Sequence, residues 1–166
     1  MQYRKLGRTN FEISDIGYGA WGIGGKQWLG GTDDESVLAL KRAIDLGVNL
    51  IDTALAYGDG HSEQLVGQAV RHTGHKIYVA TKVPPKDRIW PARAGSDIQD
   101  VFPYAYIMQC AEESLRNLGV EQMSNIIRAL TRLTYGKISL CLEFYVFRVG
   151  LAARMLVANA VAWSKV

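Results

Sequence analysis

Three side chains near the ends of two expected strands could perform acid–base chemistry together. Asp52 ends one apolar segment, Lys82 ends the next, and Tyr57 lies in the stretch that follows Asp52. A lysine cation beside a tyrosine favours the phenolate, so the phenol becomes a usable proton donor, as the reduction of a carbonyl requires. The same Asp–Lys pair could instead be a structural ion pair, because buried charges are costly unless they are paired. The position of Tyr57, on the face where a parallel barrel keeps its active site, favours the catalytic interpretation.

The length and composition of the chain limit the classes of protein to consider. Its 166 residues suffice for one domain with a core, whereas a complete (β/α)8 barrel needs roughly 200–250. The composition, 48% hydrophobic and 21% charged, predicts a globular protein. The net charge of +3, without a run of Lys and Arg, does not indicate a nucleic-acid partner.

Cysteine usage and hydropathy favour a cytoplasmic protein without a membrane span. Cys110 and Cys141 stand apart, without metal-ligand spacing, and are interpreted as reduced, buried thiols. The first residues lack the apolar run of a signal peptide. An apolar stretch over 138–163 is interrupted by Glu143, Arg148 and Arg154. Each such charge costs about 2.5–3.5 kcal/mol near a bilayer centre, so we expect no membrane partner.

Strand and helix patterns alternate through the first part of the chain. The expected strands are a hairpin over 3–6 and 11–13, followed by strands over 16–21, 48–53 and 77–83. Three helices are expected: one that begins after a capping-box sequence at 32–35, one over 61–71 and one over 103–118. A glycine-rich loop over 22–31 lacks the spacing of known phosphate-binding loops. Alternating strands and helices predict a parallel sheet whose strand ends share one face.

The composition of the chain changes near residue 123. Residues 1–122 hold 13 basic and 15 acidic side chains, whereas 123–166 hold six basic side chains and one acid, Glu143. We therefore predict two parts, 1–122 and 123–166. In the second part, 123–127 could be a fourth strand, 138–149 another strand and 151–163 a helix.

Residues 3–122 resemble the N-terminal part of the aldo-keto reductase family. The resemblance implies a partial (β/α)8 TIM barrel with an N-terminal β-hairpin, truncated to about half a barrel. The segments that carry it occur in order and are 4–9 (RKLGRT), 17–22 (GYGAWG), 47–54 (GVNLIDTA), 57–58 (YG), 62–67 (SEQLVG), 80–82 (ATK) and 114–120 (SLRNLGV).

The family's catalytic tetrad of Asp, Tyr, Lys and His places its first three members on Asp52, Tyr57 and Lys82. The resemblance implies that Tyr57 protonates the carbonyl oxygen of an aldehyde or ketone while NADPH delivers hydride to the carbon. Lys82, held by Asp52, would stabilise the developing negative charge. The family's cofactor contacts fall on Ala20, Trp21, Gln27 and again Asp52. Trp21 and Trp28 could line the substrate pocket or form an aromatic core under the loop.

The fourth tetrad member, a His soon after residue 120, has no counterpart in this chain. His61, His72 and His75 lie elsewhere and are interpreted as surface residues, and Arg128 and Ala129 occupy the expected position. The family's second half, which supplies most of the clamp on the cofactor phosphates, also has no counterpart. We therefore expect weak or no turnover of the small carbonyl substrate.

Two further hypotheses follow from these departures. Residues after about 122 could come from a frameshift or an internal deletion, which the neighbouring reading frames of the encoding DNA would test. The open edges of a half barrel predict self-association. The alternatives to an impaired oxidoreductase are a non-catalytic nicotinamide-binding or interaction module, as in reductase-like potassium-channel β subunits, and a non-functional gene product.

Overall fold

Three parallel strands form the centre of the described structure. The computed structural model describes residues 1–7, 9–25, 31–71, 73–89, 95–120, 125–127 and 144–149, the last two segments as backbone only. Strands β3 (Tyr18–Gly19), β4 (Leu50–Asp52) and β5 (Ile77–Lys82) lie side by side and run in the same direction. Their carboxyl ends therefore meet at one edge, which confirms the parallel arrangement expected for this part of the chain.

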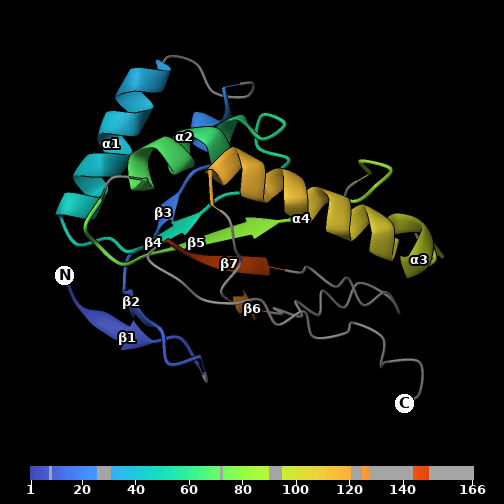
Figure 1. Cartoon of the computed structure of the whole chain (residues 1–166), viewed down its shortest axis with the longest axis horizontal. Coiled ribbons are helices and arrows are strands. Elements are labelled where there is room, and N and C mark those ends of the chain that lie inside the picture. Colours follow the sequence, from blue (N-terminus) through green and yellow to red (C-terminus); the bar gives the residue numbers. More distant parts are fainter. Residues whose placement is uncertain are drawn as a thin grey trace.

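Helices cover one face of these strands (Figure 1). They are α1 (Asp33–Asp45), α2 (His61–Val70) and α4 (Tyr104–Leu118), with a short α3 (Ile98–Val101) before α4. The capping box is present: the Thr32 hydroxyl accepts from the backbone N–H of Glu35, whose carboxylate accepts from that of Thr32. Gly119, with a φ of 65°, ends α4 in the left-handed conformation that glycine adopts easily.

The core lies between the helices and the helix-facing side of the strands. Its fully buried members include Leu40 of α1, Ile51 of β4, Val66 of α2, and Ile77 and Val79 of β5. Ile77 and Val79 are two positions apart, as expected for residues on one face of a strand. Leu40 and Ile44 of α1 are four positions apart, and so are Val66 and Val70 of α2, as expected for residues on one face of a helix.

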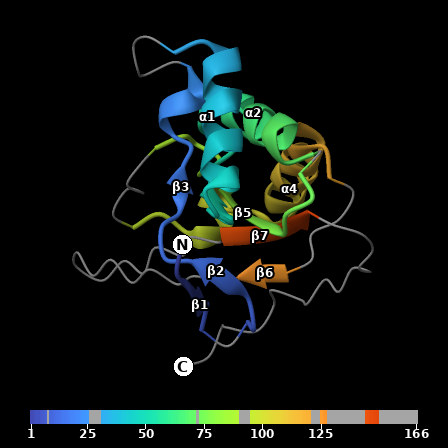
Figure 2. The same ribbon diagram turned by 90° about the vertical axis from the view of Figure 1, so that its left-hand side faces the viewer.

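A hairpin covers part of the opposite face of the strands (Figure 2). Strands β1 (Tyr3–Lys5) and β2 (Glu12–Ser14) pair antiparallel, as expected. Phe11 stacks on Tyr78 at 4.6 Å between ring centroids, and Ala80 joins this second buried cluster. Tyr78 and Ala80 alternate with Ile77 and Val79 along β5, so the two clusters lie on opposite sides of the sheet.

The continuation of the sheet beyond β5 differs from the expectation. A strand forms at β6 (Asn125–Ile127), but it does not pair with β5. Strand β7 (Phe144–Val149) lies between them and is antiparallel to both, with Lys82 opposite Phe144. The strand expected over 123–127 is thus present as β6, but the parallel arrangement expected from the alternating pattern does not continue past β5. Antiparallel β7 satisfies the backbone groups at that edge of β5 instead.

The described sheet is open, with the strand order β3-β4-β5-β7-β6, and forms a partial barrel rather than a closed one. Within the expected strand over 138–149, residues 144–149 are β7, and 138–143 lie outside the described residues, as does the expected helix over 151–163. Among the residues that the structure describes, none of the helices is long and apolar enough to cross a membrane.

Candidate active site

Asp52, Tyr57 and Lys82 meet at the carboxyl ends of β4 and β5. The Lys82 ammonium donates hydrogen bonds of 2.8 Å to both Asp52 carboxylate oxygens and to the carbonyl oxygen of Thr53. Its Nζ also lies 3.4 Å from the Tyr57 hydroxyl and 5.0 Å from the centroid of that ring. The structure thus brings together the three residues that the sequence placed at neighbouring strand ends.

The exposure of these side chains shows where the cluster is accessible. The Lys82 side chain is 16% exposed, whereas that of Asp52 is 46% exposed and Tyr57 is half-buried. The ammonium is therefore largely enclosed by the groups that it bonds, and part of the Asp52 carboxylate faces solvent. A cation this close to a phenol oxygen stabilises the negative charge that remains when the phenol gives up its proton.

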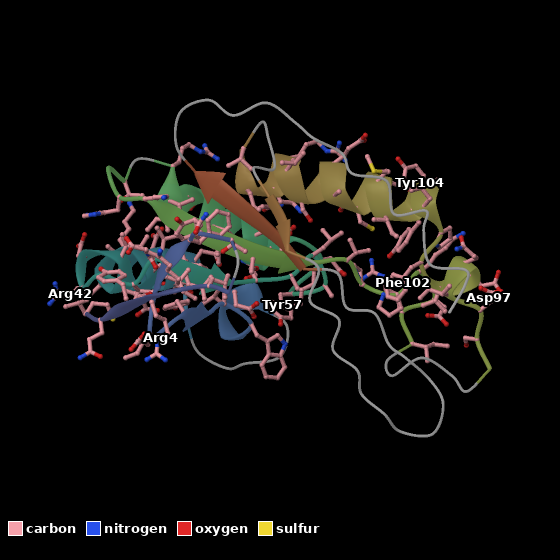
Figure 3. All side chains as sticks on the ribbon, turned by 90° about the horizontal axis from the view of Figure 1, so that it is seen from below. Arg4, Arg42, Tyr57, Asp97, Phe102 and Tyr104 are labelled. Atoms are coloured by element: carbon pink, nitrogen blue, oxygen red, sulfur yellow. The ribbon has the colours of Figure 1, made fainter. Side chains whose placement is uncertain are left out.

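A tight loop positions Tyr57 between β4 and α2, and its side chain is labelled in Figure 3. The backbone N–H of Tyr57 donates to the carbonyl of Ala54 at 3.0 Å, and the Tyr57 carbonyl accepts from the N–H of Ser62 at 3.1 Å. These bonds anchor the loop at the strand end on one side and at the first turn of α2 on the other. Tyr57 is thus fixed by its backbone on both sides.

The structure describes Ala20 and Trp21, two of the residues expected at a cofactor. Ala20 is fully buried, and its N–H donates to the carbonyl of Asp52 at 2.8 Å. Trp21 follows it and is 48% exposed. Gln27 and Trp28 lie outside the described residues. Ala20 and Asp52 are therefore neighbours, while the contact of Ala20, Trp21, Gln27 and Asp52 with a cofactor stays a prediction.

The histidines occupy different surroundings. His61 is partly exposed, at 34% of its side chain, and its Nε2 lies 2.9 Å from Asp33 Oδ1 in the first turn of α1. His75 is exposed, as expected, and His72 lies outside the described residues. His61 thus joins the beginnings of α1 and α2 instead of projecting freely. Among the described residues, no group of three or more His, Cys, Asp or Glu could hold a metal ion.

Sequence reasoning missed a buried polar network behind the site. Glu63 of α2 is fully buried and accepts hydrogen bonds from Thr81 of β5, at 2.6 Å, and from Asn117 of α4, at 2.9 Å. A signal for it was present, because Glu63 shares helical spacing with the apolar positions Val66 and Val70. A charged residue in line with an apolar face predicts a buried, hydrogen-bonded group.

Comparison with known proteins identifies relatives for most of the described chain. The model of the "Aldo/keto reductase family" matches residues 15–127. Aldo-keto reductase YhdN of Bacillus subtilis is 46% identical over 85 residues, which are 49% of this chain and 25% of that protein. The uncharacterized oxidoreductase YqkF of the same organism is 37% identical over 118 residues, 71% of this chain and 35% of YqkF.

Solved structures agree with these relatives. Glycerol dehydrogenase AKR11B4 from Gluconobacter oxydans gives a TM-score of 0.55 at 38% identity, over 73% of this chain and 37% of that one. An aldo-keto reductase from Klebsiella pneumoniae in complex with NADPH gives a TM-score of 0.51 at 32% identity, over 67% of this chain and 33% of that one. The chain thus spans between a quarter and two fifths of the length of these proteins.

Proposed function

The chain belongs to the aldo/keto reductase family, and from that membership we propose that its Asp52–Tyr57–Lys82 cluster serves the NADPH-dependent reduction of an aldehyde or ketone to an alcohol. The observation that carries the proposal is the 3.4 Å approach of the Lys82 ammonium to the Tyr57 hydroxyl, with Asp52 bonded to the same ammonium. This arrangement supports a proton donor whose conjugate base is stabilised by an adjacent cation.

Each of the three residues has a separate task in this proposal. Tyr57 donates its proton to the carbonyl oxygen, and Lys82 stabilises the phenolate that remains. Asp52 holds the ammonium in place with both carboxylate oxygens. The carbonyl carbon gains a hydride and its oxygen a proton, so the product is an alcohol.

The described residues are compatible with a nicotinamide cofactor at the carboxyl ends of β4 and β5. The exposed part of the Asp52 carboxylate can accept a hydrogen bond from a ribose hydroxyl. Trp21, which follows Ala20 in the chain, is 48% exposed and offers an aromatic surface. When bound, NADPH supplies the hydride. The Klebsiella pneumoniae relative, whose structure contains NADPH, supports the choice of cofactor.

We propose that turnover by this chain is weak. The sequence offers no histidine at the family's fourth tetrad position. The Asp52 carboxylate is partly solvated, so its interaction with Lys82 is weaker than in a site closed to water. A steady-state rate in the ordinary enzymatic range of about 1–10³ s⁻¹ would contradict this part of the proposal.

The test combines NADPH binding with turnover of an aromatic aldehyde. We expect the chain to quench NADPH or protein fluorescence with a low-micromolar Kd, and we expect Tyr57→Phe to bind equally well. Loss of the general acid should lower single-turnover reduction by about 10²–10⁴-fold. Tyr104→Phe is the matched control, because Tyr104 is exposed at the beginning of α4, distant from Tyr57 in Figure 3.

Two results would overturn the proposal. One is no binding at millimolar NADPH, and the other is equal reduction rates for the parent chain and Tyr57→Phe.

A second candidate function is that of a non-catalytic nicotinamide-binding or interaction module. A relative from Oryza sativa, named as a probable voltage-gated potassium channel subunit beta, is 39% identical over 87 residues. This candidate predicts NADPH binding without reduction of any carbonyl, together with a measurable self-association or association with another protein. Analytical ultracentrifugation with and without NADPH would test self-association.

A further inference from the structure

The first turn of α2 contacts the carboxyl ends of all three parallel strands. Ser62 donates to the carbonyl of Ala20, which follows β3, at 2.7 Å, and its hydroxyl lies 2.9 Å from that of Thr53, which follows β4. Glu63 accepts from Thr81 of β5 at 2.6 Å. Since the single hydroxyl proton of Ser62 goes to Ala20, Thr53 is the donor in the second bond.

These contacts are fully buried and completed from a second helix. Ser62 and Glu63 have no exposed surface, and Thr53 and Thr81 have at most 1%. The remaining Glu63 oxygen accepts from Asn117 of α4 at 2.9 Å. Asn117 in turn packs against Gly60, where a Cβ would overlap its side-chain amide. The carboxylate therefore has a fixed position relative to α2, α4 and β5.

The residues that this turn holds are the chain neighbours of the proposed catalytic ones. Thr53 follows Asp52, and Thr81 precedes Lys82. Successive side chains of a strand point to opposite faces, so a bond that fixes Thr81 on the helix side also fixes Lys82 on the other side. Lys82 donates to the carbonyl of Thr53 as well, which links the two strand ends directly.

We infer that Ser62 and Glu63 are positioning residues, which hold Thr53 and Thr81 from the helix side of the sheet. By doing so they set the distance between Asp52 and Lys82, and thereby the approach of Lys82 to Tyr57. The catalytic consequence rests on the proposed function, but the positions of the side chains do not. Neither side chain contacts the reacting groups, so both side chains act through the strands, while the backbone N–H of Ser62 also holds the carbonyl of Tyr57. The network reaches the ends of all three parallel strands, two of which, β4 and β5, carry Asp52 and Lys82. An ordinary core contact would not need to reach all three.

The test uses Thr81→Val, which keeps the shape of the side chain and removes the hydroxyl, and Thr81→Ser, which restores it. The first readout is trace acetylation of the folded chain, in which the reaction rate of Lys82 is measured by mass spectrometry against exposed Lys41 of α1. We expect Thr81→Val to raise the relative rate of Lys82 by about threefold or more, because local opening releases its ammonium. Thr81→Ser should return it to the parent value.

A control variant distinguishes a change in the position of Lys82 from a general loss of stability of the chain. Gly67→Ala disturbs the contact of α2 with α4, because the added Cβ would lie 2.6 Å from the carbonyl oxygen of Leu118, and it touches none of the strand ends. The inference is overturned if Lys82 reacts equally fast in Thr81→Val and in Gly67→Ala. It is also overturned if Lys82 reacts as slowly in Thr81→Val as in the parent chain. Glu63→Leu removes the acceptor itself and should reproduce Thr81→Val if that variant folds.

The second readout is turnover. We expect Thr81→Val to lower kcat by about tenfold with little change in the KM for NADPH, since misplacement of a catalytic group affects the chemical step. If the parent chain reduces no carbonyl while Lys82 responds to Thr81→Val as expected, the proposed function fails and the positioning role stands. If the parent is active and Thr81→Val has the parent's kcat and acetylation rate, the positioning role fails alone.

Discussion

Gly58, which follows Tyr57 in its loop, lies in direct backbone contact with Gly24. A Cβ on Gly58 would overlap the carbonyl oxygen of Gly24, and a Cβ on Gly24 would lie 2.9 Å from the carbonyl carbon of Tyr57. Gly58 also has a φ of 70°, which disfavours every residue with a side chain. The short 3-10 helix η1 (Gly22–Gly24), which precedes α1, and the loop that precedes α2 are therefore held together by residues without side chains.

Gly58→Ala should destabilise the chain and displace Tyr57. The added methyl group meets backbone rather than a flexible side chain, so we expect a loss of about 2–4 kcal/mol in the free energy of unfolding. Urea denaturation measures the loss, and NADPH titration reports the site. Gly7→Ala is the control for backbone conformation alone, because Gly7 has a φ of 51° and open space around it. Equal losses for both variants would show that the contact with Gly24 has no effect.

Lys82→Met should leave the Asp52 carboxylate without its ammonium partner. Because Asp52 is 46% exposed, water compensates much of the loss, and we expect a coupling free energy of only about 1 kcal/mol. A double-mutant cycle with Asp52→Asn, measured by urea denaturation, gives this value. Carbonyl reduction should fall to the level of Tyr57→Phe. Additive effects of the two substitutions would mean that the ion pair contributes nothing to stability.

Glu63→Gln should change how stability depends on pH. Burial raises the pKa of Glu63 above its ordinary value of 4.5, and bonds from Thr81, Asn117 and Ser114 oppose the rise only in part. The folded state then keeps the proton after the unfolded state has lost it. Stability contributed by this group is fully present below pH 4.5 and is lost as the pH rises through the folded-state pKa.

The measurement is the free energy of unfolding of the parent chain and of Glu63→Gln from pH 4 upward. Relative to the variant, the parent should become less stable as the pH rises above about 4.5. Glu113 of α4 is a nearby like charge that raises the same pKa, so Glu113→Gln should lower the folded-state pKa of Glu63 and shift the loss of stability to lower pH. Parallel stability profiles for the parent and Glu63→Gln would contradict a raised pKa.

Gly67→Ala should weaken the packing of α2 on α4. The backbone of Leu118 cannot move away without shifting the end of α4, so we expect a loss of about 1–3 kcal/mol. Gly74→Ala is the matched control, because nothing lies within 4 Å of a Cβ at that position and its φ is not left-handed. A smaller loss for Gly67→Ala than for Gly74→Ala would show that the two helices can separate at little cost.

Local signals in the sequence predicted much of the fold. The capping box at Thr32 and the left-handed Gly119 mark helix ends whose hydrogen bonds depend on neighbouring residues only. The meeting of Asp52 with Lys82 also follows from local information, because parallel neighbours end at one edge. The approach of Tyr57 needs only a short loop after β4. These features could therefore be predicted without any knowledge of distant contacts.

Other features depend on tertiary structure. An apolar pattern such as 144–149 predicts a strand but not its direction, so the antiparallel pairing of β7 with β5 was not foreseen. Helix α3 is four residues long, too short for helical periodicity to appear. The hydrogen-bond partners of Glu63, among them Thr81 and Asn117, lie far away in the sequence.

Strand β7 occupies the hydrogen-bonding edge of β5 that faces away from β4. A closed (β/α)8 barrel requires a parallel strand at that edge, and here β7 pairs antiparallel with every residue of β5 from Ile77 to Lys82. One edge cannot bond two strands, so any segment that offered a parallel strand to β5 would have to replace β7. The rate at which the incoming segment replaces β7 would be limited by the rate at which β7 detaches from β5. Above a certain concentration of that segment, the replacement rate would therefore stop rising.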